Sequence, residues 1–385
     1  MFGDEEVWMV ETRGEKCVKL IVLFWVKWNL SYISCLQIIL SISGKLKRVS
    51  VVIVNYNGKH FLKDCLESLR NQSFCAFETI VVDNGSKDGS AEYMRGEYPW
   101  VKVVELKENL GFAGGNNEGV RVSEGELIVL LNNDTIAEED WLKGLVEAVE
   151  PKECAAASSL ILTDGIPQKY YEKNGSLNLF GHNIMRIFNV PENIFYCGGA
   201  SLIYKKAVLG IPFDEDFFAY SEDVYLSLRA RFMGYEVKHT NASVLRHLGG
   251  GTFRKEKNET LTYFQERNRL LNYLLFFSGK TLIKMSPYFL LNFLIKTAGS
   301  LLPNKYSLTG TLRAYQYLLT SVKEIKKKRE ILQREFKVPE EEVIKWMTCK
   351  IFNEETRHAR VINKISEFYC RIVNLRSVEI AGEIR

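Results

Sequence analysis

Short apolar runs alternate with amphipathic segments from Val49 to about Val237, and this alternation constrains the fold more than any other feature of the chain. Residues 49–54 are almost continuously apolar and rich in β-branched side chains, as a strand covered on both faces of its sheet must be. Residues 61–69 then place apolar side chains at helical spacing. The strand pattern returns at residues 79–82, 101–106 and 127–131. The sequence therefore predicts an α/β fold, with a Rossmann-like, mostly parallel sheet flanked by helices.

The length of 385 residues is enough for one such domain with appendages. We expect the domain to occupy residues 48–275, where the alternation lies. Residues 1–47 would form an apolar N-terminal extension with a possible membrane segment, and residues 276–385 a helical C-terminal region that could associate with a membrane.

Two apolar stretches raise the question of membrane contact. Residues 20–43 carry one charged side chain, Lys27, and as a helix they would be long enough to cross a hydrocarbon core of about 30 Å. Their polar residues and the acidic residues before them disfavour a span, so a span, an interfacial helix and a non-native extension all stay open. Leu270–Leu302, broken by lysines and Pro287, fits an interfacial helix pair or a helical lid on the domain core. We expect the chain at the cytoplasmic face of a membrane, held peripherally or by one N-terminal anchor.

Composition argues against several classes of protein. The chain has 51 Lys and Arg against 47 Asp and Glu, so no strong net field would attract nucleic acid, and no nucleic-acid partner is expected. Its eight cysteines form no C-x-x-C pair, which is unlike a zinc site or a disulfide framework. Reduced, buried thiols are the simpler interpretation.

Polar clusters follow three of the predicted strands, at residues 55–57, 83–86 and 132–134. Ligands of open parallel sheets bind beyond the carboxyl ends of the strands, so these clusters should line one crevice. Asp83 could accept hydrogen bonds from a nucleobase or a ribose, although Asp-Asn-Gly-Ser is also an ordinary turn sequence.

A glycine-rich segment, Asn109–Asn117, opens a predicted helix. Its backbone N–H groups could face a nucleotide, or its glycines could simply allow close packing. It lacks the Gly-Lys-Ser/Thr ending of a Walker loop, so a phosphate would need its cation elsewhere.

Asp134 offers the hard oxygen ligand that Mg²⁺ or Mn²⁺ prefers. A second protein ligand could be His247, which precedes a glycine run at 249–251, although a lone histidine is more often structural.

Two carboxylates, Glu222 and Asp223, stand side by side in a segment where Ser221 could cap a helix. Capping and complementarity to the helix dipole would explain them without catalysis. Alternatively, one of them removes the proton from an acceptor hydroxyl. A helix N-terminus lowers the pKa of a carboxyl, so burial would have to raise it again, and Phe218 and Tyr220 could supply the apolar wall.

Five motifs in this order resemble family 2 glycosyltransferases, and within them most closely the rhamnosyltransferase and galactofuranosyltransferase branch. The motifs are Val51–Gly58, Val82–Ser86, Asn109–Asn116, Leu131–Thr135 and Tyr220–Asp223. The resemblance spans about residues 49–272. It implies the glycosyltransferase A fold, a divalent metal cofactor (Mg²⁺ or Mn²⁺) and inversion by single displacement. The donor would be a UDP- or dTDP-sugar, and the acceptor a glycan or a polyprenyl-linked glycan at a membrane surface.

The resemblance also implies roles for individual residues. The donor would be bound by Asn55, Tyr56, Asp83, Asn109, Gly111, Asn132 and Asn133. Asp134 and His247 would bind the metal, Asp223 would be the catalytic base with Glu222 beside it, and Phe218 and Tyr220 would belong to the acceptor site. Asn132 replaces the first Asp of the family's D-x-D motif, so metal affinity would rest on the two metal ligands and the diphosphate.

Arg267 and Arg269 could contact phosphate. No Q-x-x-R-W processivity motif is present around them, which disfavours a polymerising synthase and favours transfer of one sugar.

Two other functions remain as alternatives. A sugar nucleotidyltransferase uses a similar sheet, but it needs a glycine-rich phosphate loop with Lys or Arg after the first strand, where this chain has Asn55–Lys59. A non-catalytic nucleotide-sugar-binding membrane scaffold would keep only a decayed donor site. The joint presence of five candidate functional residues argues against it: Asp83, Asp134, Glu222, Asp223 and His247.

Overall fold

The computed structural model describes residues 49–163, 176–184, 194–249, 258–302, 306–352 and 356–381. The predicted N-terminal extension, residues 1–47, lies outside these ranges, and so does the question whether it spans a membrane. Among the described residues, no helix combines the length and the apolarity that a membrane span requires.

Within the described ranges, eight strands form one sheet in the order β3-β2-β1-β4-β9-β6-β10-β5. The first half is parallel, as predicted, and consists of β1 (Val49–Asn55), β2 (Phe77–Asp83), β3 (Lys102–Glu105) and β4 (Leu127–Asn132). The second half consists of β5 (Thr135–Ala137), β6 (Cys154–Thr163), β9 (Ser201–Lys205) and β10 (Glu236–His247). There β9 runs antiparallel to both of its neighbours, so the sheet is mixed.

Successive residues of β1 point to opposite faces of the sheet, and both faces are covered. Val51 and Ile53 pack in one apolar cluster with α3 (Lys59–Arg70) and α6 (Trp141–Val149). Val52 packs in a second cluster with residues of α5 (Gly111–Arg121), α8 (Glu222–Phe232) and α9 (Asn258–Phe276). This double burial explains why the strand is apolar at nearly every position.

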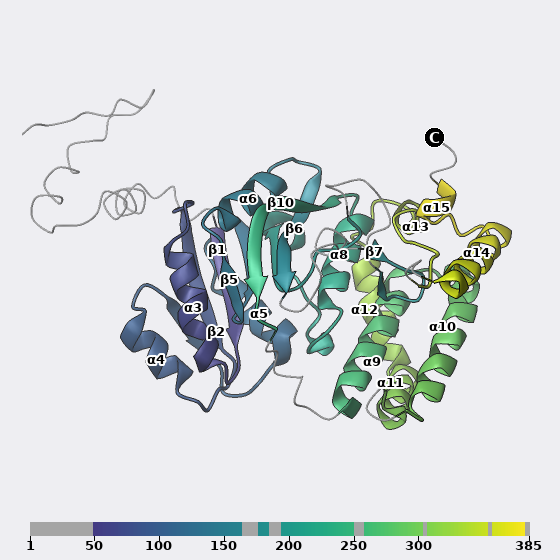
Figure 1. Ribbon diagram of the computed structural model, residues 1–385, viewed down its shortest axis with the longest axis horizontal. Coiled ribbons are helices and arrows are strands. Elements are labelled where there is room, and N and C mark those ends of the chain that lie inside the picture. The colour runs from purple at the N-terminus through teal and green to yellow at the C-terminus, as the bar shows by residue number, and fades with distance from the viewer. Residues whose placement is uncertain are drawn as a thin grey trace, which may run out of the picture.

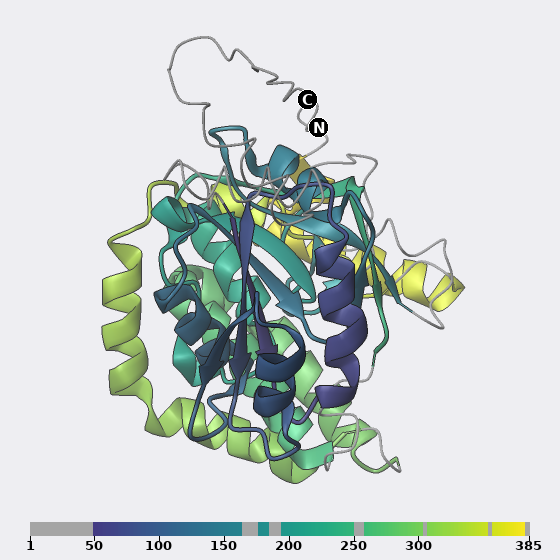
Figure 2. The same cartoon turned by 90° about the vertical axis from the view of Figure 1, so that its left-hand side faces the viewer.

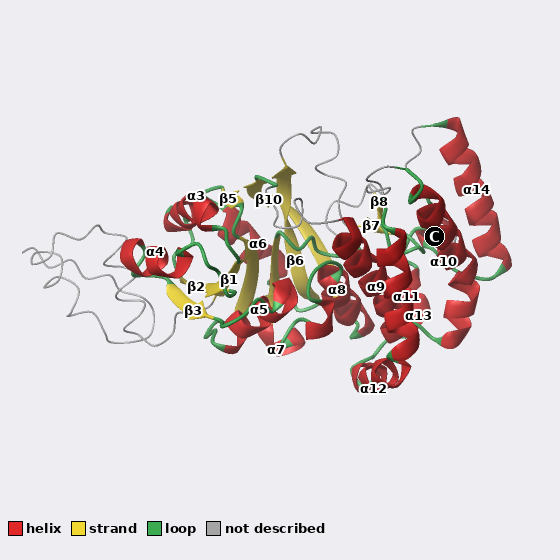
Figure 3. Ribbon diagram, turned by 90° about the horizontal axis from the view of Figure 1, so that it is seen from below, coloured by secondary structure: helices red, strands yellow, loops and turns green. Residues whose placement is uncertain are grey.

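The predicted C-terminal helical region is present and packs beyond α8, on the side of the molecule away from α3 and α4 (Ser90–Glu97) (Figures 1 and 3). It contains α10 (Gly279–Gly299), α11 (Leu308–Thr320), α12 (Val322–Gln333), α13 (Glu340–Ile344), α14 (Arg357–Ile372) and α15 (Val378–Ala381). The shorter elements are α7 (Lys206–Leu209), the 3-10 turn Glu215–Phe217 and the paired strands β7 (Ser176–Leu177) and β8 (Asn183–Ile184). Turned by 90°, the molecule shows α12 along one flank, away from α3 (Figure 2).

The apolar stretch Leu270–Leu302 is buried in its first part and partly exposed in its second. Its first part is the end of α9, where Leu271 and Leu275 are buried in the core. Its second part is α10, which leaves Ile283 and Leu290 exposed on its outer face.

Candidate active site

The polar ends of three parallel strands meet at one edge of the sheet, as the sequence predicts. Asn55 at the end of β1 is paired with Asp83 at the end of β2, and Val54 is paired with Asn132 at the end of β4. Parallel strands in this register place their carboxyl ends together, so the side chains that follow them surround one crevice.

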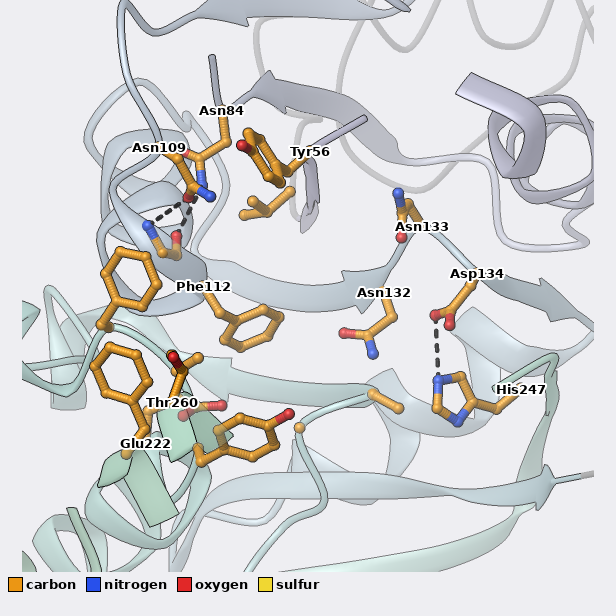
Figure 4. Close-up of a pocket in the computed structure, with 18 residues that line it drawn as sticks. Tyr56, Asn84, Asn109, Phe112, Asn132, Asn133, Asp134, Glu222, His247 and Thr260 are labelled. Atoms are coloured by element: carbon orange, nitrogen blue, oxygen red, sulfur yellow. Dashed lines mark hydrogen bonds and ion pairs between the residues drawn. The ribbon is translucent and has the colours of Figure 1, made fainter. Parts of the chain in front are cut away.

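A cavity of about 720 Å³ opens at this edge (Figure 4). Ten of the predicted site residues line it: Tyr56, Asn109, Gly111, Asn132, Asn133, Asp134, Phe218, Tyr220, Glu222 and His247. Asn55, Asp83 and Asp223 are the other predicted site residues, and each contacts or adjoins a lining residue. The structure therefore brings the predicted donor, metal and carboxylate residues to one place.

The Asp83 turn has both a structural bond and an oxygen left for a ligand. Its Oδ1 accepts a hydrogen bond from the backbone N–H of Ser86 at 2.8 Å, which is ordinary turn chemistry. Its Oδ2 is buried and has no hydrogen-bond partner. A buried carboxylate oxygen without a partner is costly, so this atom suits a donor group of a bound nucleotide.

Two asparagines hold the glycine-rich segment against the strand ends. Asn84 donates through Nδ2 to Asn109 Oδ1 and to the Gly111 carbonyl, both at 2.9 Å, and its Oδ1 accepts from the Leu110 N–H. Both side chains line one end of the cavity (Figure 4). Asn84 belongs to the polar cluster at 83–86 that was predicted to line the crevice, but the sequence indicated no separate role for it.

Two of the N–H groups at the start of α5 are bonded within the protein. The Gly111 N–H donates to Asn109 Oδ1 at 2.8 Å, and the Ala113 N–H donates to the Phe218 carbonyl at 3.0 Å, so neither faces a ligand. The glycines serve close packing instead. Gly111 has a φ of +73°, and a Cβ there would lie 2.4 Å from the Phe218 carbonyl oxygen. A Cβ on Gly119 would lie 2.3 Å from Val52, so this helix could not approach β1 with side chains there.

Asn132 and Asn133 differ in how far they are committed to the protein. Asn133 donates through Nδ2 to Asn55 Oδ1 at 2.8 Å. Asn132 keeps a buried Oδ1 that has no partner and lies at the cavity wall. Asn132 is therefore the amide of the pair that is free to bond a donor hydroxyl.

Asp134 and His247 face one another, with Asp134 Oδ1 and His247 Nε2 separated by 3.1 Å (Figure 4). The sheet enforces this contact, because β10 pairs antiparallel with β5 in a register that sets His247 opposite Thr135. Within the ranges that the structure describes, no third His, Cys, Asp or Glu completes a metal-binding group with them. A carboxylate and an imidazole fit a divalent ion that takes its remaining ligands from water and a diphosphate. Gly250 and Gly251 of the adjacent run lie outside the described residues.

Glu222 and Asp223 occupy the first turn of α8 but have different surroundings. Glu222 lines the cavity, is 7% exposed and has a buried Oε2 without a partner. Asp223 Oδ2 accepts from the Gly199 N–H at 3.2 Å, and its Oδ1 accepts from the Val224 N–H at 2.8 Å. Burial raises the pKa of both carboxyls, and the charge of Asp223 raises that of Glu222 further. Burial thus overcomes the helix N-terminus, as a catalytic base at this position requires.

The loop before these carboxylates has an unusual backbone, and the predicted cap at Ser221 is wrong. Phe218, Tyr220 and Ser221 have φ values of +56°, +73° and +64°, and the Ser221 side chain makes no capping hydrogen bond. Left-handed backbone at three of four consecutive non-glycine residues persists only where surrounding contacts enforce it.

Those contacts come from α9, which the sequence analysis did not assign to the site. The buried Asn268 donates through Nδ2 to the carbonyls of Phe217, Ala219 and Tyr220, each at 2.7 Å. Asn272, one helical turn later, donates to the Ser221 carbonyl at 2.9 Å. Two asparagines four residues apart, so on one face of the helix, were the sequence signal for this role.

Helix α9 also contributes to the cavity wall. Thr260 and Phe264 line it, and the ring of Phe264 stacks on Phe218 with centroids 5.1 Å apart. The stacked rings extend the apolar wall that was expected of Phe218 and Tyr220 alone.

The expected phosphate contacts of Arg267 and Arg269 are contradicted. Arg267 is buried and donates to the Asp216 and Phe217 carbonyls, so it supports the same loop as Asn268. Arg269 is buried in an ion pair with Glu266 at 2.9 Å. Both guanidinium groups are therefore committed to partners within the fold.

The cysteines follow expectation within the described ranges. Cys65, Cys154, Cys197, Cys349 and Cys370 are buried free thiols, and Cys75 is a partly buried one. Cys17 and Cys35 lie outside those ranges.

Solved structures share this fold. GalNAc-T7, crystallised with UDP, GalNAc and Mn²⁺, superposes with a TM-score of 0.55 at 15% identity, over 74% of this chain and 55% of that chain. Residues 1–349 of S. aureus TarS, crystallised with UDP-GlcNAc, superpose with a TM-score of 0.50 at 17% identity, over 86% of this chain and 89% of that one. The fold is thus that of the glycosyltransferase A proteins.

Proteins similar to this chain in sequence are also named as glycosyltransferases. An uncharacterized glycosyltransferase of Haemophilus influenzae is 26% identical over 56% of this chain and 74% of its own length. YfnE, an uncharacterized glycosyltransferase of Bacillus subtilis, is 34% identical over 33% of each chain. GlyG, a glycosyltransferase of Streptococcus pneumoniae, is 32% identical over 27% of this chain and 36% of its own. The chain thus spans about a third of the length of the last two relatives.

Residues 50–210 match the profile of glycosyl transferase family 2. This range contains the Asp83 turn, the glycine-rich segment and the Asn132–Asp134 strand end, which lie at or next to the cavity. The chain therefore carries a family 2 glycosyltransferase domain.

Proposed function

We propose that this glycosyltransferase moves one hexosyl unit from a UDP- or dTDP-sugar to a hydroxyl of a glycan or polyprenyl-linked acceptor, with inversion. The observation that carries the proposal is the composition of the cavity. Polar strand ends suited to a nucleotide lie on one side, and the buried Glu222, with Asp223 next to it, lies on the other, where the Phe218 and Phe264 rings stack. We assign the reaction to residues 48–275. The rhamnosyltransferase and galactofuranosyltransferase branch stays a prediction.

The donor would occupy the strand-end side. Asp83 Oδ2 and Asn132 Oδ1 are buried oxygens without partners, and each can accept a hydrogen bond from the base or ribose of a nucleotide. The UDP and UDP-GlcNAc in the crystal structures of similar folds support a uridine nucleotide as the first donor to test.

A divalent ion held by Asp134 and His247 would neutralise the charge that develops on the departing diphosphate. The Mn²⁺ in the GalNAc-T7 crystal structure supports this choice of ion. Asn132 adds no charge to the site, so the diphosphate oxygens would supply much of the remaining coordination.

The acceptor hydroxyl would attack the anomeric carbon from the side opposite the nucleotide. The new C–O bond forms as the bond to the diphosphate breaks, and a carboxylate takes the hydroxyl proton. Asp223 is the better candidate for that base, because two backbone N–H groups stabilise its charged form. Glu222, whose pKa is raised further, would stay protonated and donate a hydrogen bond to a sugar oxygen.

A screen of UDP- and dTDP-sugars for Mn²⁺-dependent release of UDP or dTDP tests the reaction. Asp223→Asn should abolish transfer while UDP binding, measured by calorimetry, stays nearly unchanged. Asp64→Asn, at an exposed carboxylate of α3, is the matched control and should keep full activity. Unchanged turnover in Asp223→Asn, with loss in Glu222→Gln, would assign the base to Glu222 instead.

Two further results would replace the proposal. Pyrophosphate release from a nucleoside triphosphate and a sugar phosphate would identify a nucleotidyltransferase. Nucleotide-sugar binding with no turnover of any donor would identify a scaffold.

A further inference from the structure

Helix α14 has the reverse of the usual amphipathic arrangement, because its apolar side chains face outward and its small and polar ones face the protein. Its inward face consists of Ala359, Asn363, Ser366 and Cys370, which are small or polar. Its outward face is apolar: Val361, Ile365, Phe368 and Ile372 are 51%, 64%, 66% and 66% exposed. Surface helices normally bury the apolar stripe, so this arrangement needs a specific cause.

Hydrogen bonds hold α14 in this orientation. Ser366 donates to the Cys349 carbonyl and bonds the Tyr288 hydroxyl of α10 at 2.8 Å. Asn363 Oδ1 accepts from the Ile351 N–H at 2.8 Å. Rotating the helix to bury its apolar stripe would break these bonds. The partner groups, such as the Cys349 carbonyl and the Ile351 N–H, would then lie unpaired beneath apolar side chains. The apolar face is therefore held outward by the structure.

Helix α10 contacts α14 and has exposed apolar residues of its own. The two helices meet at the edge of the molecule farthest from α3 and α4 (Figures 1 and 3), and the Tyr369 hydroxyl donates to the Lys284 carbonyl at 2.9 Å. Exposed apolar residues recur along the outer side of α10: Ile283, Leu290, Leu291 and Leu294 are 75%, 60%, 39% and 54% exposed. We call the outward residues of both helices the α10–α14 face.

Basic residues border this face. Arg357, Arg360, Lys364 and Arg371 are exposed and follow one another at helical spacing along one edge of the apolar stripe of α14. Glu367, the single acidic residue in the sequence of α14, pairs with Arg371 at 3.0 Å, so Arg357, Arg360 and Lys364 supply most of the positive charge; the sequence of α10 has no acidic residue. An apolar stripe with a cationic border matches the boundary between acyl chains and anionic headgroups.

We propose that the α10–α14 face docks the protein on the surface of an anionic lipid bilayer. The apolar residues enter the acyl-chain boundary, and the basic row contacts the lipid phosphates. A second copy of the chain fits less well, because self-association through this face would bring two cationic borders together. Docking through this face does not depend on the transfer reaction. It would place the membrane contact on a defined surface that includes α14.

Vesicle flotation of the purified full chain tests the docking. We expect binding to vesicles of 70% phosphatidylcholine and 30% phosphatidylglycerol. Binding to pure phosphatidylcholine should be much weaker, and high salt should weaken the binding to anionic vesicles. Ile365→Ser with Phe368→Ser should lower the partition coefficient by at least about tenfold, because two apolar anchors are lost. Arg360→Glu with Lys364→Glu should lower it on anionic vesicles only.

The matched control is Leu319→Ser, at a side chain of α11 that is 77% exposed and lies outside the α10–α14 face. It should bind vesicles like the wild type. Since all the changed positions are exposed, thermal unfolding and the release of UDP from a soluble donor should be unchanged in every variant, which separates docking from transfer.

Equal binding by the wild type and both double variants would overturn the proposal. So would equal binding to neutral and anionic vesicles. The face would instead bind a second copy of the chain if the wild type formed a dimer in light scattering, did not bind vesicles, and became monomeric when Ile365 and Phe368 were both changed to Ser.

Discussion

The Gly199 N–H donates to Asp223 Oδ2 at 3.2 Å, and Gly199 itself lines the cavity. A glycine thus stands between the cavity and the proposed base. A Cβ at this position would lie 3.6 Å from Asp223 Oδ2 and 3.7 Å from Glu222 Oε1, which is ordinary contact distance. The absence of a side chain therefore leaves both carboxylates open to an acceptor without being needed for packing.

Gly199→Ala should consequently lower kcat by about tenfold or more, because the methyl group displaces the acceptor hydroxyl from the carboxylates. Steady-state kinetics with saturating donor would measure this. The thermal unfolding midpoint should change little, since no close contact is created. Gly198→Ala, at the neighbouring glycine, is the control and should keep its activity. Full activity in Gly199→Ala would mean that the acceptor reaches the base by another route.

The pH dependence of activity and stability should report the carboxylate pair. Burial raises the pKa of Asp223 to about 6 and that of Glu222 to about 8. If Asp223 is the base, kcat should rise as the pH passes through about 6. If Glu222 donates a hydrogen bond, kcat should fall as the pH passes through about 8. A pH–rate profile measures both limbs, and Glu222→Gln should remove the alkaline one.

The same pKa shift predicts a stability effect with a definite sign. The folded state holds the Glu222 proton more tightly than the unfolded chain does, so the protonated form stabilises the fold below the ordinary carboxyl pKa. That contribution is lost as the pH rises through about 8. Between these limits the unfolding midpoint of the wild type should fall relative to that of Glu222→Gln. Parallel curves for the two proteins would contradict the raised pKa.

The sequence predicted well where the polar strand ends on the proposed donor side would meet, because their meeting depends on local pattern. A buried strand followed by polar residues is visible in the chain, and parallel pairing then brings Asn55 beside Asp83. For the glycine-rich segment, the sequence left two interpretations open. A run of glycines does not distinguish N–H groups that face a ligand from a helix packed closely on Val52.

The support of the proposed acceptor side was harder to predict, because it comes from residues about 50 positions later in the chain. The positive φ values of Phe218 and Tyr220 are held by contacts with α9, and no glycine or other local sequence feature at residues 218–221 predicts them. Ser221 occupies the capping position, but the left-handed backbone leaves its side chain without a capping bond. The mixed half of the sheet likewise depends on β9, which the sequence did not place.

Asn268→Ala should both destabilise the protein and slow the reaction. It removes the amide whose two N–H groups are shared among three carbonyls of the strained loop, and buried carbonyls left unpaired cost about 1–3 kcal/mol each. We expect a loss of about 2–5 kcal/mol in the free energy of unfolding, because the loop can relax in part. Urea denaturation measures this loss.

Asn272→Ala, which removes a single bond to the Ser221 carbonyl, should cost less than Asn268→Ala. At a temperature where both variants are folded, the fall in kcat should be larger for Asn268→Ala, with KM for the donor nearly unchanged. That split would show that Asn268 positions the loop before Glu222. Equal falls in kcat and donor affinity would indicate a general loss of structure instead.

Removal of the metal ligands should weaken ion binding before it affects the fold. Asp134→Asn takes the carboxylate out of the pair with His247, whose Nε2 lies 3.1 Å away, and leaves an amide that binds divalent ions poorly. In the presence of UDP, calorimetry should show an affinity for Mn²⁺ at least about tenfold weaker, and His247→Ala should behave similarly. Activity should vanish in EDTA and return with added Mn²⁺. Full activity in EDTA would exclude an essential ion at Asp134, and the charge of the departing diphosphate would then have to be neutralised by other groups.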